Sequence, residues 1–395
     1  MFDCPDVGQN SGHEPSASAG GLRCIALIGG GRWSRVILPV LRDILPIDCE
    51  IAWITHHGYD RAVTWLSERA LPGISIHQSR ETLTHRMDAA IVATTPANHA
   101  QQVHELISQN IPTFCEKPLT TSFEHATRLI DLANCNCCPL GVNLELHYAS
   151  YLDQFVDLMK HRLIQKVDIL WLDPWTEQRY GETKHGDFYT DIVHDMWPHC
   201  WSVLRRLAGG GSSMDFDSVS YHPIDGAQIA VRCPQWSAGI RLSRRNGDRV
   251  RRIEINGGQA ILEFSQEPGW SEIDGTTVQH AWHGPRPLTR SLQSFLDVVM
   301  NFDLLNGWPL QAASCLDSVR LADHITSKLN EIYLERVSRL RESGVDLNSA
   351  SCRNVIIDVY LPLIAAQGRR WPACTELQQI EFVKHICTTQ LIRYY

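Results

Sequence analysis

The sequence predicts an α/β protein: a doubly wound parallel sheet first, then an α+β domain with a large, mostly antiparallel open sheet. Two observations carry this prediction. Over residues 21–144, short apolar runs alternate with helix-like segments, as in parallel sheets with crossover helices. After about residue 145, strand-like segments follow one another with tight turns. The chain of 395 residues is long enough for two such domains, each with its own core.

The alternation in the first domain begins with a buried strand, Cys24 to Ile28, whose apolar run ends abruptly in glycines. A helix over 34–44 follows, with Val36, Leu38 and Leu41 on its apolar side. Strands and helices then alternate up to residue 144, which predicts a doubly wound sheet. The further strands are expected at 49–55, near 74, and at 87–94, 111–115 and 139–144, and the helices at 60–70, 98–109 and 121–133.

The second domain, 145–330, is expected to be built around a β-hairpin. Residues 241–245 and 250–255 flank Asn246-Gly247, a strong hairpin signal. A third strand, 260–264, follows the turn at 256–258. Helices are expected at roughly 190–207, 290–301 and 311–328.

The two ends of the chain differ from the domains. Residues 1–20 are rich in Ser, Gly, Asp and Pro, which predicts a disordered tail. Residues 331–395 are expected to form a helical extension. The apolar stretch 355–365 indicates that this extension packs on the body or on a second subunit.

Composition excludes several classes of function. The net charge of −8 argues against nucleic acid as the main partner. No apolar run reaches the ~18 to 20 residues that span a membrane, and residues 1–20 do not resemble a signal peptide. Thirteen scattered cysteines in a large chain indicate a reducing cytoplasm. The cluster Cys135, Cys137 and Cys138 lacks a fourth ligand nearby, so we expect no metal site.

The glycine turn Gly29-x-Gly31-x-x-Ser34 is the first motif that carries chemistry. It follows a strand and opens a helix, which favours a dinucleotide site over a plain βα turn. Gly29 allows the tight turn, and Gly31 lets the backbone approach a pyrophosphate, whose charge meets the free N–H groups of the helix. Ser34 replaces the usual third glycine or alanine.

The end of the second strand bears on the choice of cofactor. An acid there would bind a ribose 2′-hydroxyl, but Thr55, His56 and His57 occupy the place, and no carboxylate follows until Asp60. The missing carboxylate removes repulsion against a 2′-phosphate, so the sequence favours NADP, with NAD as the alternative. Arg32 and the two histidines are candidate phosphate contacts, although surface histidines explain the same pattern.

Four segments together resemble the glucose-fructose oxidoreductase/inositol dehydrogenase family, Gfo/Idh/MocA. They are 29–34, Ala93-Thr-Thr-Pro-Ala-Asn-His99, Glu116-Lys-Pro118, and Asp195-Met-Trp-Pro-His199 followed by Leu207-Ala-Gly209, and a fifth, 252–258, resembles the family's sheet hairpin. The similarity covers about residues 22–328. It implies a Rossmann domain, an NAD(P)-dependent oxidoreductase and a homo-oligomer formed through the open sheet face. The cofactor-binding residues are then expected to be Gly29, Gly31, Arg32, Trp33, Ser34, Thr55, His56, Thr94, Thr95, Pro96, His99, Glu116 and Lys117.

Three residues are the candidate catalytic group. Lys117 matches the family lysine between nicotinamide and substrate, where an ammonium stabilises charge on the reacting oxygen. His199 is the candidate general base, because imidazole titrates near neutral pH. The resemblance selects it over His194, because His199 and Gly209 keep the family's spacing between the histidine and the closing glycine. Asp195 lies one helical turn before His199, so it either orients that imidazole or contacts a substrate hydroxyl.

Departures from the family pattern concern the substrate. Trp197 stands where the family usually has glycine, and Ser202 where it usually has aspartate. His147 replaces a common arginine and either lines the pocket or simply ends a strand. Trp197 and His147 are the candidate substrate residues, and Trp171 is a further tryptophan that either stacks on substrate or belongs to the core.

Six arginines between Arg241 and Arg252 flank the predicted hairpin turn. They indicate either a phosphate or polyanion site, or a solvated hairpin or subunit interface. The resemblance favours the second interpretation, because the family uses its open sheet face for oligomers.

The resemblance implies hydride transfer between nicotinamide and a secondary alcohol or ketone of a sugar, cyclitol or sugar-like small molecule. One alternative is reduction of an imine or another biosynthetic intermediate. Another is a dinucleotide-binding sensor or scaffold without turnover, which the extension 331–395 slightly favours. Retention of both Lys117 and His199 disfavours that reading.

Overall fold

The computed structural model describes residues 21–342, apart from residues 85, 175, 186–189, 210–212, 223–225 and 245. The predictions for 1–20 and for 343–395, including the apolar stretch 355–365, lie outside the described residues. Within the described part, no helix combines the length and the apolar character needed to cross a bilayer.

The first domain is a six-stranded sheet in which every pair of neighbouring strands is parallel. The strand order is β3-β2-β1-β4-β5-β6, which confirms the predicted doubly wound sheet. The strands are nearly all apolar because helices cover both faces. They are β1 (Cys24–Ile28), β2 (Glu50–Ile54), β3 (Ile74–His77), β4 (Ala89–Val92), β5 (Thr113–Glu116) and β6 (Leu140–Asn143).

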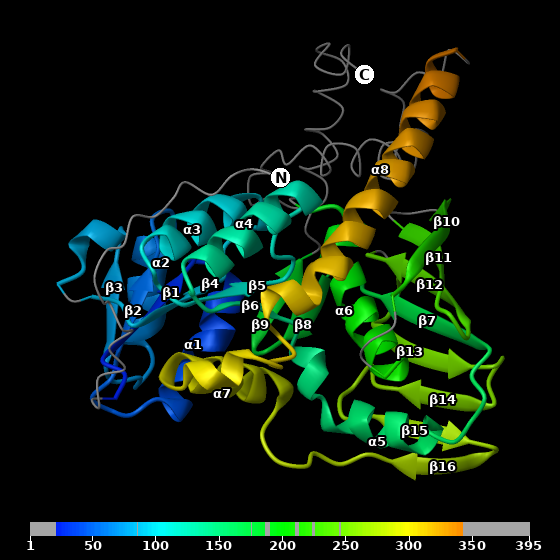
Figure 1. Ribbon diagram of the computed structural model, residues 1–395, viewed down its shortest axis with the longest axis horizontal. Helices are drawn as coiled ribbons and strands as arrows, with labels where there is room; N and C mark the ends of the chain where they lie inside the picture. Colours follow the sequence, from blue (N-terminus) through cyan, green and yellow to red (C-terminus); the bar gives the residue numbers. More distant parts are fainter. Residues whose placement is uncertain are drawn as a thin grey trace.

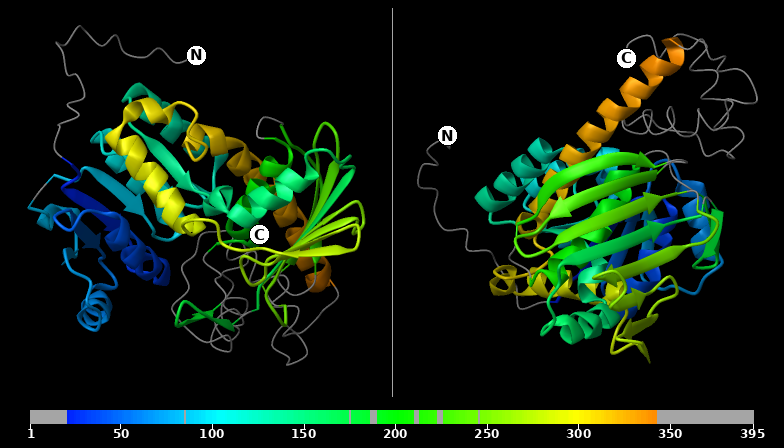
Figure 2. Two further views of the ribbon diagram at one scale, coloured as in Figure 1. Left: turned by 90° about the horizontal axis from the view of Figure 1, so that it is seen from below. Right: turned by 90° about the vertical axis from the view of Figure 1, so that its right-hand side faces the viewer.

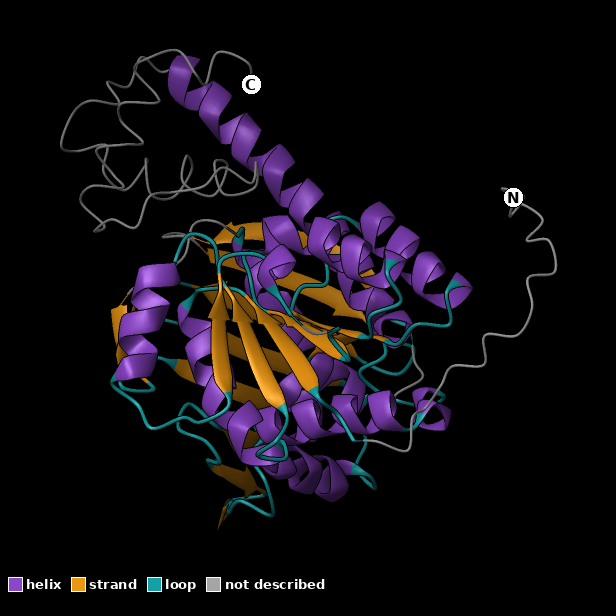
Figure 3. Ribbon diagram, turned by 90° about the vertical axis from the view of Figure 1, so that its left-hand side faces the viewer, coloured by secondary structure: helices purple, strands orange, loops and turns teal. Residues whose placement is uncertain are grey.

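Helices lie on both faces of this sheet (Figure 1; Figure 3). In Figure 1, α3 and α4 lie above it and α1 and α7 below it. The strand order reverses between β1 and β4, so the carboxyl ends of these strands open a crevice beside the start of α1. The helices are α1 (Arg32–Ile44), α2 (Tyr59–Ser67), α3 (Pro96–Ser108), α4 (Phe123–Cys135) and α7 (Pro287–Met300). A short 3₁₀ turn, η1, spans Arg80–Thr82.

The second domain contains an eight-stranded sheet in the order β10-β11-β12-β7-β13-β14-β15-β16. All neighbours are antiparallel except β7 and β12, as predicted for a mostly antiparallel sheet. Helix α6 packs against one face, and no described helix covers the other (Figure 2). The homo-oligomer expected through that face stays a prediction. The elements are α5 (Ser150–Met159), β7 (Lys166–Leu172), α6 (Ile192–Leu207), β10 (Asp215–His222), β11 (Gly226–Arg232), β12 (Ser237–Ser243), β13 (Val250–Ile255), β14 (Ala260–Glu263), β15 (Trp270–Ile273) and β16 (Thr276–Gln279).

The predicted hairpin across Asn246-Gly247 is wrong. Strands β12 and β13 are not neighbours, because β7 lies between them and pairs with both. The segment 244–249 crosses the end of β7, where the Asn246 N–H donates to the carbonyl of Asp173 at 3.0 Å. The next turn, 256–259, does join the paired strands β13 and β14.

A separate two-stranded hairpin, β8 (Thr176–Arg179) and β9 (Glu182–His185), reaches from the second domain to the first. Its turn, Tyr180-Gly181, has positive φ at both residues (55° and 72°), as type I′ turns require. Glu182 accepts two hydrogen bonds of 2.7 Å from Arg35 on α1. The sequence interpretation did not include this hairpin.

The chain returns to the first domain after the large sheet. Helix α7 contacts α1, and the Val142 N–H donates to the Leu310 carbonyl at 2.9 Å. Helix α8 (Ala312–Glu342) then runs without interruption through residue 330, so the predicted boundary at 330/331 falls inside one helix. The predicted boundary between the two domains at residue 144 stays a prediction. Residues 287–311, which follow the large sheet in the sequence, pack on the first domain. Two short 3₁₀ turns complete the elements, η2 (Glu145–Tyr148) and η3 (Phe302–Leu305).

Candidate active site

A cavity of about 400 Å³ lies between the two domains, within the size range of small-molecule sites. It extends from the start of α1 and the ends of β4 and β5 to β7, α6 and the segment before β13. Charged side chains dominate its wall, with more cations than carboxylates. These side chains are Arg32, Lys117, Arg179, Lys184, Arg244, Arg249 and Arg251, with Glu116, Glu145, Asp173, Asp195 and Glu267.

The glycine turn leaves the start of α1 open. Gly29 has φ +139°, and a Cβ there would lie 2.3 Å from the Ala93 carbonyl oxygen. Gly30, which the motif did not single out, is equally constrained, because its Cβ would lie 2.0 Å from Thr55 Oγ1. Gly31 is the N-cap residue of α1, no side chain caps the helix, and a Cβ there would have no atom within 4 Å. The first N–H groups of α1 therefore face open space, which fits a pyrophosphate.

The predicted cofactor residues differ in their position relative to the cavity. Arg32, Trp33, Thr94, Pro96, Glu116 and Lys117 line the cavity. Thr95 precedes Pro96 as the N-cap residue of α3, and His56 is exposed beside His57.

Ser34, Thr55 and His99 are buried and do not line the cavity. The direct cofactor contact expected of them stays a prediction. Thr55 packs against Gly30. The His99 ring nitrogens lie 2.7 Å from the Pro118 carbonyl oxygen and 3.1 Å from that of Thr94, so His99 joins the loops that follow β4 and β5.

Lys117 follows β5, and Asp195 holds its side chain. The Nζ atom donates to Asp195 Oδ1 at 2.8 Å and to the Asp195 carbonyl oxygen at 2.7 Å. Burial acts to raise the pKa of Asp195, but the Lys117 ammonium and the Arg244 guanidinium outweigh it and hold that pKa well below its usual range. The carboxylate is thus ionised and orients Lys117 rather than His199. The peptide bond between Lys117 and Pro118 is cis.

His199 lies on α6 and lines the same cavity as Lys117. Its ring stacks on Trp171, with centroids 5.0 Å apart and planes at 10°. Burial lowers the pKa of His199 well below 6.5, and the Lys117 ammonium lowers it further. Nδ1 is buried and has no hydrogen-bond partner among the described residues. His194, by contrast, lies outside the cavity and contacts Asp191 at 2.5 Å.

Residues 23–144 match the family model described as the oxidoreductase family with an NAD-binding Rossmann fold. The first domain belongs to the Gfo/Idh/MocA family. The match includes the glycine turn, the segment 93–99 and the Glu116-Lys-Pro triplet. The matched domain is therefore an NAD-binding Rossmann fold of an oxidoreductase family.

Solved structures share the fold across both domains. UDP-N-acetylglucosamine 3-dehydrogenase GnnA from Acidithiobacillus ferrooxidans is 15% identical, with a TM-score of 0.62, over 78% of this chain and 97% of that one. The 3-ketoreductase KijD10 from Actinomadura kijaniata, in complex with NADP and TDP-benzene, is 17% identical, with a TM-score of 0.64, over 78% and 98%. The dehydrogenase MviM from Clostridium difficile is 15% identical, with a TM-score of 0.62, over 78% and 99%.

Trp197 and His147, the candidate substrate residues, do not line the cavity. Trp197 is fully buried, and its indole N–H donates to the Ser318 carbonyl on α8 at 3.2 Å. The carbonyl of His147 accepts from Arg206, and burial, followed by Arg206, lowers the pKa of the His147 ring to about 4. The turn η2 presents Glu145 and Leu146 to the cavity. The substrate roles of Trp197 and His147 stay predictions.

Two groups in the cavity were not singled out as site residues from sequence. The first is Glu145, near Glu116 and Glu267. Burial, then the charges of Glu267 and Glu116, raise the pKa of Glu145 to about 8, so this carboxyl is largely protonated at neutral pH. The second is a set of cations around Asp173 at the end of β7, which includes two arginines of the run 241–252, Arg249 and Arg251.

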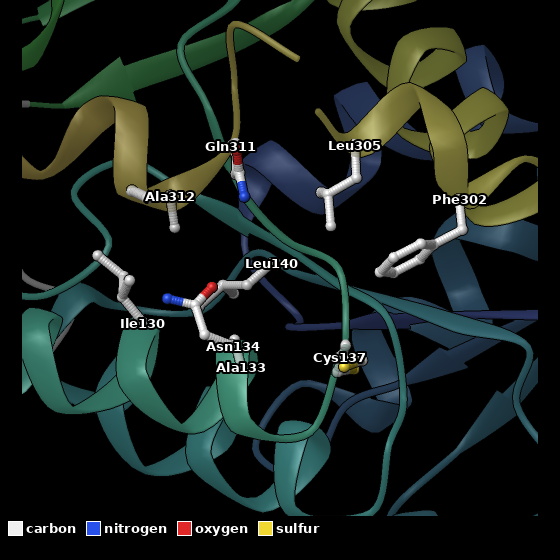
Figure 4. A pocket seen from close by; sticks show the side chains of 11 residues that line it. Ile130, Ala133, Asn134, Cys137, Leu140, Phe302, Leu305, Gln311 and Ala312 are labelled. Atoms are coloured by element: carbon white, nitrogen blue, oxygen red, sulfur yellow. The ribbon is translucent and has the colours of Figure 1, made fainter. Parts of the chain in front are cut away.

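A smaller hollow of about 150 Å³ lies between the end of α4 and the segment 302–313 (Figure 4). Apolar side chains such as Ile130, Leu140 and Phe302 form most of its wall. None of the described residues that line it is charged, so it offers no acid, base or anion contact.

Proposed function

We propose that this protein catalyses reversible hydride transfer between nicotinamide carbon C4 and a secondary alcohol or ketone of a sugar, cyclitol or sugar-like molecule. The observation that carries the proposal is that the Lys117 ammonium and the His199 imidazole line one cavity, which begins at the open end of α1. The similarity to a UDP-N-acetylglucosamine 3-dehydrogenase and to a 3-ketoreductase supports the same class of reaction.

Lys117 is the electrostatic anchor for the reacting oxygen. An ammonium has three N–H donors, and Asp195 accepts two of them. The remaining donor faces the cavity, where it stabilises negative charge on the substrate oxygen as the C–O bond changes order. Asp195 is the residue that fixes this direction.

His199 is the acid/base. In the direction of alcohol oxidation, its neutral imidazole accepts the hydroxyl proton while a C=O bond forms. In the reverse direction the imidazolium returns that proton to the new alkoxide. Bound NAD(P) accepts or supplies the hydride.

NADP is the cofactor that the residues after β2 fit best. Thr55 is buried, and the exposed residues that follow are His56 and His57 rather than a carboxylate. A 2′-phosphate therefore meets no acidic side chain at this strand end. The prediction is tighter binding of NADPH than of NADH, measured by nicotinamide fluorescence.

Fluorescence titration followed by a turnover screen on polyols and keto-sugars tests the proposal. Lys117→Ala is expected to lower kcat by about 10²- to 10³-fold, because the anchor for the oxygen is lost. NADPH affinity should change little, because the start of α1 is unaltered. Lys160→Ala, at the exposed residue that follows α5, is the control.

Two results would count against this assignment. Near-normal turnover by the Lys117→Ala variant would remove the role of the ammonium. Tight NADPH binding without consumption across a broad substrate panel would instead favour the sensor.

A further inference from the structure

Three cations surround two carboxylates at the end of β7, and we call this group the basic subsite. Asp173 accepts from Arg251 and also pairs with Lys184 at 3.2 Å and Arg249 at 3.3 Å. Glu177, on β8, pairs with Lys184 at 3.2 Å and with Arg249 at 3.8 Å. Among the residues that the structure describes, three positive side chains thus share these two carboxylates, an excess of one positive charge within the group.

A neighbouring group of charged side chains lines the same cavity. Lys117 and Arg244 both pair with the carboxylate of Asp195, at 2.8 and 3.4 Å. Although burial acts to raise the pKa of Asp173, Arg251, Lys184 and Arg249 hold it well below its usual range, so this carboxylate is ionised and already contributes its full negative charge. Partly buried cations that outnumber their carboxylate partners are stabilised when a further anion binds beside them.

The basic subsite lies next to the candidate base. Trp171 separates the two: its ring stacks on His199 on one side, and the Arg251 guanidinium lies 4.1 Å from its centroid. Arg251 is buried, and its Nε has no hydrogen-bond partner among the described residues. Arg249 and Lys184 keep 17% and 29% of their side chains exposed and line the cavity wall.

We propose that the substrate carries an oxyanion group, a carboxylate or a phosphate, which the basic subsite binds through Arg249 and Lys184. This rests on the proposed hydride transfer and narrows its substrate from sugar-like molecules in general to sugar acids or sugar phosphates. Guanidinium groups bind such oxyanions through paired N–H donors, and the ammonium adds a point charge. The reacting carbon then lies on the His199 side of Trp171 and the anion on the Arg251 side.

Isothermal titration calorimetry on the full chain with NADPH bound tests this. NADPH and an alcohol cannot react together, so binding is measured whether or not turnover occurs. The ligands are matched sets of hexoses, hexuronates and hexose 6-phosphates. We expect at least one anionic series to bind roughly 10-fold or more tightly than its neutral hexoses.

Arg249→Gln and Lys184→Gln each remove one charge from partly exposed positions, which favours folded variants. Each should weaken binding of the preferred anion by about 10- to 100-fold and leave the neutral hexose unchanged. Arg252→Gln is the matched control, because Arg252 lies outside the cavity and pairs with Glu254 at 2.6 Å. Binding of hexuronates alone identifies a carboxylate, and binding of hexose phosphates alone identifies a phosphate.

Three results overturn the proposal: equal binding of charged and neutral ligands, no binding of either anion series, or unchanged anion binding in both cavity variants. Unchanged anion binding in both variants would mean that the ion pairs of the basic subsite only stabilise the fold. Anion binding without turnover would keep the subsite and count against hydride transfer. Turnover of neutral hexoses that is unaffected by Arg249→Gln would support hydride transfer and count against the basic subsite.

Discussion

The protonation state of His199 follows from its surroundings rather than from its type. Burial favours the neutral ring, and the Lys117 ammonium adds repulsion against a second positive charge. Trp171 fixes the plane of the imidazole by stacking on it. The neutral base is thus present at pH values where an ordinary histidine is mostly protonated, which suits proton abstraction from an alcohol.

This gives a prediction for the pH dependence of alcohol oxidation. The acid limb of the kcat/KM profile should have its midpoint well below pH 6.5, because the pKa of His199 is lowered. His199→Asn should lower kcat/KM by about 10²- to 10⁴-fold and remove that limb. A midpoint at or above 6.5 that persists in His199→Asn would assign the base to another residue. His194→Asn does not alter a cavity residue, so its profile should keep the limb.

Sequence predicted which residues meet in the cavity better than it predicted their partners. The pairing of Asp195 with Lys117 joins residues 78 positions apart, and no local pattern reports it. Helical spacing correctly placed Asp195 and His199 on one helix, but it could not show that the carboxylate pairs with Lys117. The Trp197 indole turns to α8, a helix whose position only the tertiary structure determines.

At the scale of elements, the parallel sheet was predictable because each strand and crossover helix repeats one local pattern. The second sheet was not, because its order depends on pairings between distant segments. Asn246-Gly247 has the residues of a hairpin turn, yet β7 pairs with both flanking strands. This error hid the basic subsite: a hairpin would put Arg249 in solvent, whereas the crossing over the end of β7 brings it to Asp173.

The β8–β9 hairpin contacts the side chains of the first turn of α1. Arg35 and Glu182 form a two-point ion pair, the Tyr180 ring meets Trp33 edge-on at 6.1 Å, and the Arg32 guanidinium donates to the Arg179 carbonyl at 3.4 Å. The hairpin therefore joins the two domains across the proposed pyrophosphate site. We expect it to slow release of the dinucleotide.

Glu182→Gln tests this role of the hairpin. Loss of one charge from a pair that is only 21% and 27% exposed should speed NADPH release by about 2- to 10-fold. Stopped-flow fluorescence with excess NADP as the competitor measures the rate. Thr183→Ala is the matched control, because Thr183 bonds within the hairpin, to Gln178 at 2.7 Å, and not across the domains. Equal release rates in all three proteins would show that the hairpin does not hold the cofactor in.

At the scale of the whole molecule, the two domains are joined by more than the connection at residue 144. The returning segment places Trp308 against Phe114 and Phe295, with centroids 5.7 and 6.1 Å apart. It also passes directly over β6, where a Cβ on Gly141 would lie 2.1 Å from the Trp308 ring. The cavity depends on this packing, because Lys117 comes from one domain and His199 from the other.

A double-mutant cycle at Gly141 and Trp308 tests this packing. Gly141→Ala should destabilise the protein by about 1–3 kcal/mol, because the indole has to move to admit a methyl group. Trp308→Leu removes a buried ring and should cost roughly 2–4 kcal/mol. In the double variant the methyl group fills part of the space that the ring leaves. The combined loss in urea denaturation should therefore be smaller than the sum of the single losses, by about 1 kcal/mol or more. Additive losses would show that the two residues do not share this contact.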